Sequence, residues 1–289
     1  MIEKILKTFK NKSICVFGGT GTVGSIIVEY LREFTPKVIR IFSNDENSLW
    51  ESQQKWSNDG LRYLLGDIRN YNRVKRALKG IDYVFNCAAI KHVPFAEYNP
   101  LEAVETNILG LDNIINASVE CGVKKILHIS TDKAVEPTTV MGATKMISER
   151  LLQMRWTQNS ETDMVCVRFG NVYGSRGSIV QIIRECKKRG EPITITDPNM
   201  TRYFMQEDEV IELLFNAFAN GCKGEIWVPK LKPVLLSEII KKEVGINYSY
   251  KIIGARKAEK FSEKLLFDHE ILETIDNDKY WIVPNEYRK

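Results

Sequence analysis

The 289-residue chain has six widely spaced cysteines and only three histidines, and no two cysteines form a Cys-x-x-Cys pair. Such a pattern provides no ligand set for a structural zinc site and is typical of reduced thiols in the cytoplasm. No apolar run approaches the roughly 20 residues that a membrane span requires, and no signal-peptide pattern precedes the first expected strand. We therefore expect a cytoplasmic protein with no metal site and no membrane partner.

The chain also lacks a strong excess of one charge, because 41 Lys and Arg residues nearly balance 37 Asp and Glu residues, for a net charge of +4. A nucleic-acid-binding protein would cluster its basic residues, so this balance indicates only a modest attraction to small phosphate-bearing ligands. What the chain does contain is 44% apolar and 27% charged residues, as in soluble globular enzymes. Its length allows one large domain and a smaller lobe.

Short apolar runs alternate with helical patterns along the first half of the chain. The expected strands are 14–17, 37–42, 61–65, 83–87, 125–129 and 164–169. Because parallel strands need long right-handed crossovers, this alternation predicts an α/β fold with a doubly wound parallel sheet. We expect residues 1–173 to form a nucleotide-binding Rossmann domain and residues 174–289 a smaller, partly interleaved lobe. Residues 1–12 have apolar side chains at helical spacing and are expected to pack on the core or on a neighbouring subunit.

A glycine-rich turn follows the first expected strand. Gly18, Gly21 and Gly24 have the spacing G-x-x-G-x-x-G, and a helical pattern begins directly after them. The first two glycines allow a tight turn close to a pyrophosphate, and the third lets helix and strand pack closely. The N-terminus of the helix adds free amides and a positive dipole. Ordinary turns also contain glycine triplets, but this context favours a dinucleotide site.

The end of the second expected strand bears on the choice of dinucleotide. In NAD sites an acid at this point binds the ribose hydroxyls, whereas here the strand ends in Ser43 and Asn44, and the nearest acid follows two residues after Ser43. Ser43 and Asn44 suit a ribose phosphate, although no arginine follows Ser43. The pattern slightly favours NADP, with NAD as the alternative. Asp67 is placed to bind adenine, and Ala88 and Ala89 leave room for the nicotinamide ribose.

The stretch 130–145 carries an unusual set of ionisable side chains. Asp132 and Lys133 follow an apolar strand, and Lys145 lies one turn inside the next helix, on the same face as Met141. An acid and an amine side by side at a strand end, with a second amine nearby, suit acid–base catalysis. Taken alone, the stretch is equally compatible with a surface loop of ordinary charges.

Together these patterns resemble the extended short-chain dehydrogenase/reductases, and more narrowly the soluble UDP-N-acetylglucosamine 4,6-dehydratases that make amino sugars for flagellin, capsule and glycan decoration. The matching stretches are 18–24, 66–69, 89–94, 97–102, 106–108, 130–145, 168–172, 174–178, 194–197, 200–203, 253–256 and 259–260. The Asp132-Lys133 pair and the run 91–94 are the most specific, since related dTDP-glucose dehydratases carry Asp-Glu at the pair and 4-epimerases lack it.

Three features depart from the family pattern. Phe17 stands where threonine is common, and Lys257-Ala258 replaces a proline–glycine pair, which makes the following loop less rigid. Met141 stands where most short-chain dehydrogenases have the catalytic tyrosine, as it does in some of these dehydratases. Because a thioether has no proton to exchange, we expect Met141 to line the pocket and not to act as the base.

The resemblance implies an internal oxidation, elimination and reduction of a UDP-sugar. Hydride leaves carbon 4, water is eliminated across carbons 5 and 6, and the hydride returns to carbon 6, so that a tightly bound cofactor is regenerated in each turnover. The family assigns Lys133 as the base at carbon 5 and Asp132 as the acid for the leaving hydroxyl. Thr131 would bond the carbon 4 hydroxyl, and Lys145 the nicotinamide ribose. With Met141 in place of tyrosine, the proton of the carbon 4 hydroxyl would pass to Asp132 or to a bound water.

The resemblance also implies two sets of binding residues. For the cofactor these are Gly18, Thr20, Gly21, Thr22, Val23, Gly24, Ser43, Asn44, Asp67, Ile68, Ala88, Ala89, Lys91, Asn107 and Lys145. For the substrate they are Lys91, His92, Glu97, Asn171, Ser178, Thr194, Arg202, Arg256 and Glu259. Arginine suits a diphosphate because its fork binds two oxygens at once, but each charge taken singly is also typical of a solvated surface. A direct role for His92 and a place in a polar loop are equally compatible with its position, whereas His128 inside a strand indicates a hydrogen-bonded core residue.

Three functions fit these observations to different degrees. The first is a lyase, a UDP-GlcNAc 4,6-dehydratase of polysaccharide biosynthesis that assembles, like its relatives, as a dimer to hexamer. A nucleotide-sugar 4-epimerase or reductase is the alternative, although an epimerase needs the tyrosine that Met141 replaces. A catalytically silent NADP-sensing protein would have no use for the pair Asp132-Lys133.

Overall fold

The computed structural model describes residues 2–56, 60–159, 161–245 and 250–287. Its helices are α1 (Ile2–Phe9), α2 (Thr22–Glu33), α3 (Glu46–Lys55), α4 (Tyr71–Leu78), α5 (Val93–Tyr98), α6 (Pro100–Val104), the π-helical turn η1 (Glu105–Leu109), α7 (Gly110–Glu120), the 3₁₀ turn η2 (Asp132–Ala134), α8 (Val140–Gln158), α9 (Ile179–Arg189), α10 (Glu207–Asn220), α11 (Leu236–Val244) and α12 (Asp268–Ile271). Its strands are β1 (Ser13–Phe17), β2 (Val38–Ser43), β3 (Leu61–Leu65), β4 (Tyr83–Asn86), β5 (Lys125–Ile129), β6 (Asp163–Val167), β7 (Asn171–Val172), β8 (Ile193–Ile195), β9 (Thr201–Arg202), β10 (Phe204–Met205), β11 (Glu225–Pro229), β12 (Val234–Leu235), β13 (Tyr250–Ile252), β14 (Ile275–Asn277) and β15 (Tyr280–Val283).

A nine-stranded sheet with the order β14-β15-β11-β6-β5-β4-β1-β2-β3 forms the centre of the molecule. The strands from β3 to β11 in this order pair in parallel, and β15 pairs antiparallel with both β11 and β14. The strand order reverses direction beside β1, because the chain first builds β2 and β3 on one side and then β4, β5 and β6 on the other. This arrangement confirms the predicted α/β fold with a doubly wound parallel sheet.

Alternate side chains of each central strand enter two separate hydrophobic cores, one on each face of the sheet. In β1, Ile14 and Val16 pack with residues of α1, α2 and α10, whereas Cys15 and Phe17 pack with residues of α4, α7 and α8. The two faces are covered because the crossover helices lie on both sides of a parallel sheet. The strands therefore have continuous apolar sequences, and the polar groups gather at the strand ends.

Helix α1 packs on the core of its own chain, which confirms one of the two expectations for residues 1–12. The Phe9 side chain is fully buried. Its ring lies 5.3 Å from that of Phe215 in α10 and 5.0 Å from that of Phe218, and it stacks on Phe34 at 5.8 Å. These contacts attach α1 to the same face of the sheet as α10.

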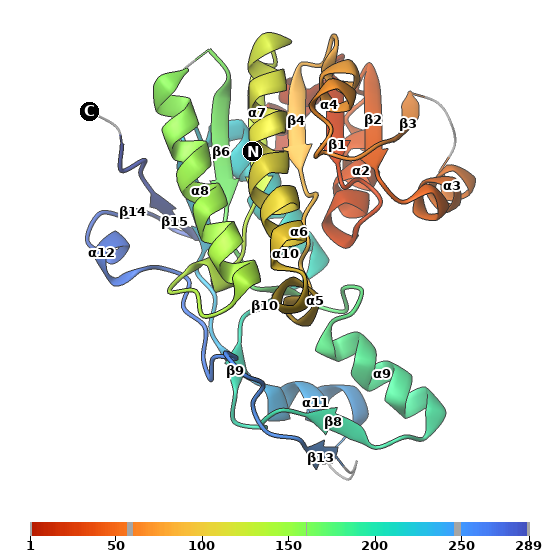
Figure 1. The fold of residues 1–289 in the computed structure, drawn as a ribbon, viewed down its shortest axis with the longest axis vertical. Coiled ribbons are helices and arrows are strands. Elements are labelled where there is room, and N and C mark those ends of the chain that lie inside the picture. The colour runs from red at the N-terminus through yellow and green to blue at the C-terminus, as the bar shows by residue number, and fades with distance from the viewer. Residues whose placement is uncertain (1, 57–59, 160, 246–249, 288–289) are drawn as a thin grey trace.

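The smaller lobe lies beyond the carboxyl ends of the parallel strands (Figure 1). It contains α9, β8, α11 and β13, and its own core consists of Val180, Ile183, Ile193, Ile195, Ile239 and Ile240. Between and after these segments the chain returns to the large sheet through α10, β11, β15 and β14. The division of the chain at residue 173 stays a prediction, and any boundary between the lobes has to be drawn through several segments.

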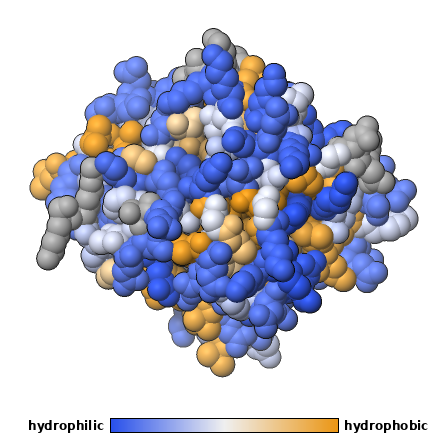
Figure 2. All heavy atoms as spheres, turned by 90° about the horizontal axis from the view of Figure 1, so that it is seen from above, coloured by the Kyte–Doolittle hydropathy of each residue, from blue (hydrophilic) through white to orange (hydrophobic). Residues whose placement is uncertain are grey.

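Hydrophilic side chains cover most of the face in Figure 2, and the orange apolar side chains between them form only small groups. Within the described ranges, every helix is too short or too polar to cross a membrane.

Candidate active site

Two cavities lie at the carboxyl ends of the parallel strands, where the sheet faces the smaller lobe. The larger, of about 790 Å³, extends from residues 21–24 to α8, and the smaller, of about 330 Å³, lies among α9, β8 and residues 253–263. The residues that line both are Lys91, His92, Lys133, Asn171, Gly177 and Ser178. The cavities therefore adjoin at these residues, and a ligand that reached from one to the other would pass Lys133.

The glycine-rich turn connects β1 to α2 as its spacing predicts. Gly18 has φ +69°, and a Cβ at Gly24 would lie 2.2 Å from the Gly18 carbonyl oxygen. Only glycines allow this approach of helix to strand. Residues Gly21, Thr22, Val23 and Gly24 line the larger cavity, so the N-terminus of α2 points free backbone amides at it.

The end of β2 differs from the prediction. The Ser43 hydroxyl is buried, accepts a hydrogen bond from Thr20 Oγ1 at 2.9 Å, and accepts another from the Asp45 amide at 3.2 Å. Arg40 is also occupied, because its guanidinium donates to the carbonyl oxygens of Ala77 and Lys79. Hydrogen bonds from Ser48, above all from its hydroxyl, lower the pKa of Asp45. An anionic carboxylate and an already bonded hydroxyl therefore stand where a ribose phosphate was expected.

Arg176 lines the larger cavity, although it is not among the predicted binding residues. It lies in the loop between β7 and α9, its side chain donates to the Thr20 carbonyl oxygen, and its amide donates to Thr22 Oγ1 at 3.4 Å. Lys91 donates in turn to the Arg176 carbonyl at 2.9 Å. These contacts hold a guanidinium against the glycine-rich turn, at the wall of the larger cavity. The position in a Gly-Ser-Arg-Gly-Ser run is the signal that could have identified it.

Asn107 holds a residue of the cavity wall in place by hydrogen bonds. Its side-chain amide exchanges two hydrogen bonds with the backbone of Ile90, at 2.8 and 3.1 Å, and donates to Thr144 Oγ1 at 2.9 Å. The π-helical turn η1 brings Asn107 into this buried position. Ile90 lines the larger cavity and Asn107 does not, so its predicted cofactor contact is replaced in this structure by support of the cavity wall.

The acid–amine pair lies behind the junction of the two cavities. Lys133 Nζ is 2.9 Å from Asp132 Oδ1, which also accepts a hydrogen bond from Thr131 Oγ1 at 2.9 Å. The Asp132 side chain is fully buried, whereas Thr131 and Lys133 line the larger cavity. Gly142 permits this arrangement, because a Cβ there would lie 2.3 Å from the Lys133 carbonyl oxygen.

Two further charged residues from the C-terminal part of the chain complete the surroundings of Lys133. Glu263 Oε1 lies 4.0 Å from Lys133 Nζ, and Glu263 Oε2 lies 3.2 Å from Lys260 Nζ. Lys260 also donates to the Val135 carbonyl at 2.6 Å. The Glu263 side chain is 6% exposed, so this carboxylate is balanced by ammonium groups and not by water. No periodicity or motif in the sequence brings residue 263 to residue 133.

Lys145 is buried at the wall of the larger cavity. Its Nζ lies 3.1 Å from Nε2 of His128 and donates to the carbonyl oxygen of Ile129. Burial lowers the pKa of Lys145 to about 8 and lowers the pKa of His128 well below its ordinary value. His128 thus is the hydrogen-bonded core residue that its strand position predicts.

Met141 lines the larger cavity and is packed among Ala96 and Ala103. It therefore has the lining position that the sequence predicts for a residue without an exchangeable proton. The position of Glu97 differs from the prediction, because its carboxylate accepts a hydrogen bond from the Val140 amide at 2.7 Å at the start of α8. Glu97 lines neither cavity and supports the helix that carries Met141.

The smaller cavity gathers the expected diphosphate residues. Arg202 Nη2 lies 3.1 Å from Glu259 Oε1, and Glu259 Oε2 accepts from the Arg256 amide at 3.1 Å. The other predicted residues that line this cavity are Lys91, His92, Asn171, Ser178 and Thr194. Partial burial lowers the pKa of Lys91, and the nearby charge of Arg176 lowers it further. Partial burial likewise lowers the pKa of His92, with a further contribution from the charge of Lys91. The cavity wall is therefore rich in donors for an anionic ligand.

Several predicted residues line neither cavity. They are Gly18, Thr20, Ser43, Asn44, Asp67, Ile68, Ala88, Glu97, Asn107 and Asp132. Asp67 forms an ion pair with Arg69 at 2.7 Å. Partial burial raises the pKa of Asp67, but the hydrogen bonds from the Arg69 side chain and amide outweigh it, so the pKa is lowered. Ligand contacts at these residues therefore stay predictions.

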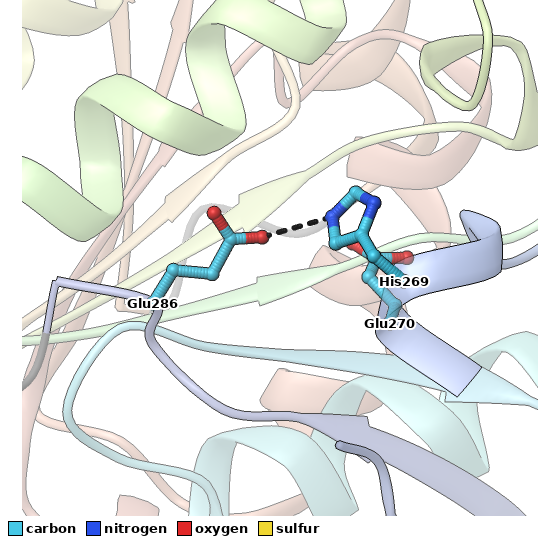
Figure 3. A group of neighbouring side chains, drawn as sticks. All are labelled: His269, Glu270 and Glu286. Carbon is cyan, nitrogen blue, oxygen red and sulfur yellow. Dashed lines mark hydrogen bonds and ion pairs between the residues drawn. The ribbon is translucent and has the colours of Figure 1, made fainter. Parts of the chain in front are cut away.

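A cluster of His269, Glu270 and Glu286 lies away from both cavities (Figure 3). Glu270 forms buried ion pairs with Arg168 at 2.6 and 2.8 Å, and Glu286 pairs with Arg150 as well as with His269. Since arginines already neutralise both carboxylates, a divalent cation would have to displace them. The geometry is that of an ion-pair cluster that attaches the C-terminal segment to α8 and to the residue after β6.

Comparison with known proteins gives a consistent family relationship. Residues 14–285 match the family model described as "Polysaccharide biosynthesis protein". The chain is 40% identical, over 98% of its length and 89% of the relative, to an uncharacterized membrane protein of Methanocaldococcus jannaschii. It is 36% identical, over 97% of its length and 85% of the relative, to the UDP-glucose 4-epimerase of Rickettsia canadensis.

Solved structures share the fold. Pen from Bacillus thuringiensis is similar with a TM-score of 0.93 and 38% identity, over 97% of this chain and 92% of that one. DesIV, a dTDP-glucose 4,6-dehydratase of Streptomyces venezuelae with NAD and TYD bound, has a TM-score of 0.78 and 21% identity, over 88% of both chains. At that identity the second similarity bears on the fold alone.

Proposed function

The chain belongs to the polysaccharide biosynthesis protein family, and from this premise we propose that it is a UDP-GlcNAc 4,6-dehydratase that uses a nicotinamide dinucleotide. The coarser assignment is an enzyme of the nucleotide-sugar dehydratase and epimerase group with the extended short-chain dehydrogenase/reductase fold. It accords with the name of the 36%-identical relative and with the fold of the solved structures. The product would be the UDP-linked 2-acetamido-4-keto-2,6-dideoxyhexose.

The observation that carries the proposal is the position of Lys133. It lines both cavities, and the buried carboxylate of Asp132 lies 2.9 Å behind it. An elimination needs a protein base and a protein acid that act on the same substrate. In the proposed reaction they must lie near the point where the nucleotide-sugar site meets the nicotinamide site. An epimerase has no use for this second acid–base pair, since it only removes and returns hydrogen at one carbon.

In the proposed reaction each cavity has a distinct task. The glycine-rich turn and Arg176 would hold the dinucleotide pyrophosphate, and Arg202 and Arg256 the UDP diphosphate. When bound, a nicotinamide dinucleotide accepts the hydride from carbon 4 and later returns it to carbon 6. Lys133 would first pass its ammonium proton to the Asp132 carboxylate 2.9 Å away, and as a neutral amine it would then remove the carbon 5 proton.

Asp132 would protonate the departing carbon 6 hydroxyl. Its side chain is fully buried, so the proton would reach the substrate by a relay through Thr131, which lies 2.9 Å from Asp132 Oδ1 and lines the cavity. The Thr131 hydroxyl would turn to accept from the protonated Asp132 and give its own proton to the leaving oxygen. Thr131 is therefore the contact residue for this pair.

For the cofactor, the end of β2 supports NAD over NADP, which the sequence slightly favours. The Ser43 hydroxyl and the Arg40 guanidinium are already bonded, and Asp45 is an anion at the strand end. A ribose phosphate would be repelled by that anion, whereas ribose hydroxyls could donate to it. Equilibrium dialysis against each dinucleotide tests this choice, and tighter binding of NADP would contradict it.

UDP-glucose 4-epimerase activity is the second candidate, because relatives of 36% identity have that name. One incubation separates the two. With UDP-GlcNAc, the dehydratase forms a product that is lighter by one water without net consumption of cofactor, as mass spectrometry would show. A product of unchanged mass that is an epimer of UDP-GlcNAc or UDP-glucose would establish the epimerase instead, and no conversion of either sugar would reject both.

We expect a homo-oligomer. Phe95, Tyr98, Leu101 and Leu109 are between 53% and 88% exposed on the adjoining elements α5, α6 and η1, which leaves an apolar face of the kind that subunits bury. Light scattering after gel filtration would measure the assembly.

A further inference from the structure

A buried chain of hydrogen bonds runs behind the larger cavity from β4 through β5 to α8. The Ala88 amide donates to Asn86 Oδ1 at 3.2 Å, and Asn86 Nδ2 lies 3.1 Å from His128 Nδ1. On the other side of the ring, His128 Nε2 lies 3.1 Å from Lys145 Nζ. Asn86 and His128 are each 1% exposed and Lys145 is 5% exposed, so water does not offer these atoms other partners.

The Ala88 amide determines the direction of this chain. Because a backbone N–H can only donate, the atom of Asn86 that faces it is the carbonyl oxygen, and the NH₂ group faces His128 Nδ1. That nitrogen must then accept, so we assign the proton of the neutral imidazole to Nε2. The Nε2–H group points at Lys145 Nζ. An ammonium has no lone pair to accept this bond, whereas a neutral amine has one. The chain therefore favours the neutral form of Lys145.

Burial of Lys145 acts in the same sense, whereas the nearby acidic groups oppose it. Burial is the largest influence on its pKa, which lies at about 8. Glu149 opposes this shift only partly, because both of its oxygens are engaged by Arg168 at 3.0 and 2.7 Å. Burial raises the pKa of the neighbouring Cys87 thiol to about 12 and that of Cys166 well above its ordinary value, so both are uncharged. At pH 8 an ordinary lysine is neutral in roughly one molecule in 250, whereas a pKa of 8 makes this about half.

We propose that Asn86 and His128 hold Lys145 as a neutral amine, and that this amine is the base that removes the proton of the sugar hydroxyl in the oxidation step. It takes the task that Met141 cannot perform. Lys145 and Met141 both line the larger cavity, whereas the Asp132 side chain is fully buried and lines neither cavity. The proposal rests on the proposed function only in its first step, the oxidation of a secondary hydroxyl, which a dehydratase and an epimerase share.

The step balances with the groups already named. The lone pair of Lys145 Nζ gives up its hydrogen bond from His128 Nε2–H and takes the proton of the hydroxyl, whose O–H bond breaks. The C–H electron pair leaves as hydride to the nicotinamide dinucleotide, and a C=O bond forms. The resulting ammonium faces the Nε2–H of His128, donor against donor. This opposition favours release of the proton to water in the cavity, which restores the amine before the next turnover. His128 and Asn86 are positioning residues, and Lys145 is the catalytic residue.

The first test uses the ligand-free protein and needs no activity. The chain has only three histidines, so ¹⁵N spectra of histidine-labelled protein, assigned with His92→Gln and His269→Gln, can identify the tautomer of His128. We expect the Nε2–H tautomer. In ¹³C-lysine spectra we expect the Lys145 Cε resonance to titrate near pH 8, and to move up by about one pH unit in Asn86→Leu, where the ring can reverse its tautomer. An Nδ1–H tautomer, or titration of Lys145 near pH 10.4, would overturn the proposal.

The second test separates a base from a mere ribose contact. Lys145→Arg keeps a cation and its donors but cannot become neutral under these conditions. We expect it to bind the dinucleotide within a few-fold of wild type and to reduce it with UDP-GlcNAc roughly 100- to 10,000-fold more slowly in a single turnover. Lys125→Arg is the matched control. Lys125 begins β5, whereas Lys145 contacts Ile129 at the other end of that strand, so this variant should leave the rate unchanged. Reduction by Lys145→Arg at the wild-type rate would refute the base role. If wild type itself reduced no dinucleotide, the proposed function would fall, and the spectra would still decide the state of Lys145.

Discussion

Lys133 Nζ lies 4.0 Å from Glu263 Oε1 and 2.9 Å from Asp132 Oδ1, so one ammonium stands between carboxylates from two distant parts of the chain. Lys260 pairs with the other oxygen of Glu263. The C-terminal segment thus supplies charge to a site whose other members come from the β5–α8 connection. Removing the Glu263 charge would leave two ammonium groups facing each other in a largely buried position.

Glu263→Gln is therefore expected to slow dehydration of UDP-GlcNAc while leaving dinucleotide binding unchanged. Loss of one hydrogen-bonded charge costs about 1–3 kcal/mol, which corresponds to roughly a 10- to 100-fold lower kcat. Steady-state kinetics and the dinucleotide Kd measure the two effects. The control is Glu136→Gln, which removes an exposed partner of Lys264 and should change neither quantity. A wild-type kcat in Glu263→Gln would show that the Glu263 charge does not contribute to the reaction.

Arg176→Ala tests the contact between the β7–α9 loop and the glycine-rich turn. Because the guanidinium lies against Thr20 and lines the larger cavity, we expect its loss to weaken dinucleotide binding by about 10- to 100-fold, the effect of one charged hydrogen bond to phosphate. Isothermal titration would measure the Kd. Arg184→Ala, in the same lobe but paired with Glu243, is the matched control and should bind as wild type does. Equal weakening in both variants would indicate a general loss of lobe structure.

The buried cluster around Arg168 should govern the attachment of the C-terminal segment. Arg168 is bonded to Glu149 and Glu270, and all three side chains are nearly inaccessible. Glu270→Ala leaves a buried guanidinium without one of its partners, so unfolding free energy is expected to fall by about 3–5 kcal/mol. Urea denaturation followed by circular dichroism would show it. His269→Ala removes an exposed neighbour and should cost less than about 0.5 kcal/mol. Similar losses in both variants would contradict the central role of Arg168.

Lys145 should make stability depend on pH in one defined window. Its pKa is lowered from 10.5 to about 8 in the folded protein. Between these values the unfolded chain binds more protons, so stability rises with pH from about 8 to 10.5 and the cost of burying the ammonium is fully present below pH 8. The difference in unfolding free energy between wild type and Lys145→Met is expected to change by about 3 kcal/mol across this window. A difference that stays constant would show that Lys145 titrates alike in both states.

Much of the site followed from the sequence because its determinants are local. The spacing of Gly18, Gly21 and Gly24 after an apolar run requires a tight strand–helix turn, and the order of apolar runs places Asp132 and Lys133 at a strand end. Parallel strands bring their carboxyl ends to one edge, so these groups meet without any detailed knowledge of packing. The sheet, the crossover helices and the place of the cavities were predictable for this reason.

The direct contacts depended on the tertiary structure. Glu263 reaches Lys133, Arg176 reaches Thr20, and Asn86 reaches His128 only because separate segments fold back onto the same edge. Such long-range pairs have no periodic signature, and their hydrogen-bond direction and desolvation depend on neighbours from several strands at once. The sequence by itself determined which chemical groups stand at the edge of the sheet. Only the tertiary structure decided which of them are buried, which are already bonded, and which are left to meet a ligand, because burial and partner choice belong to the packed chain as a whole.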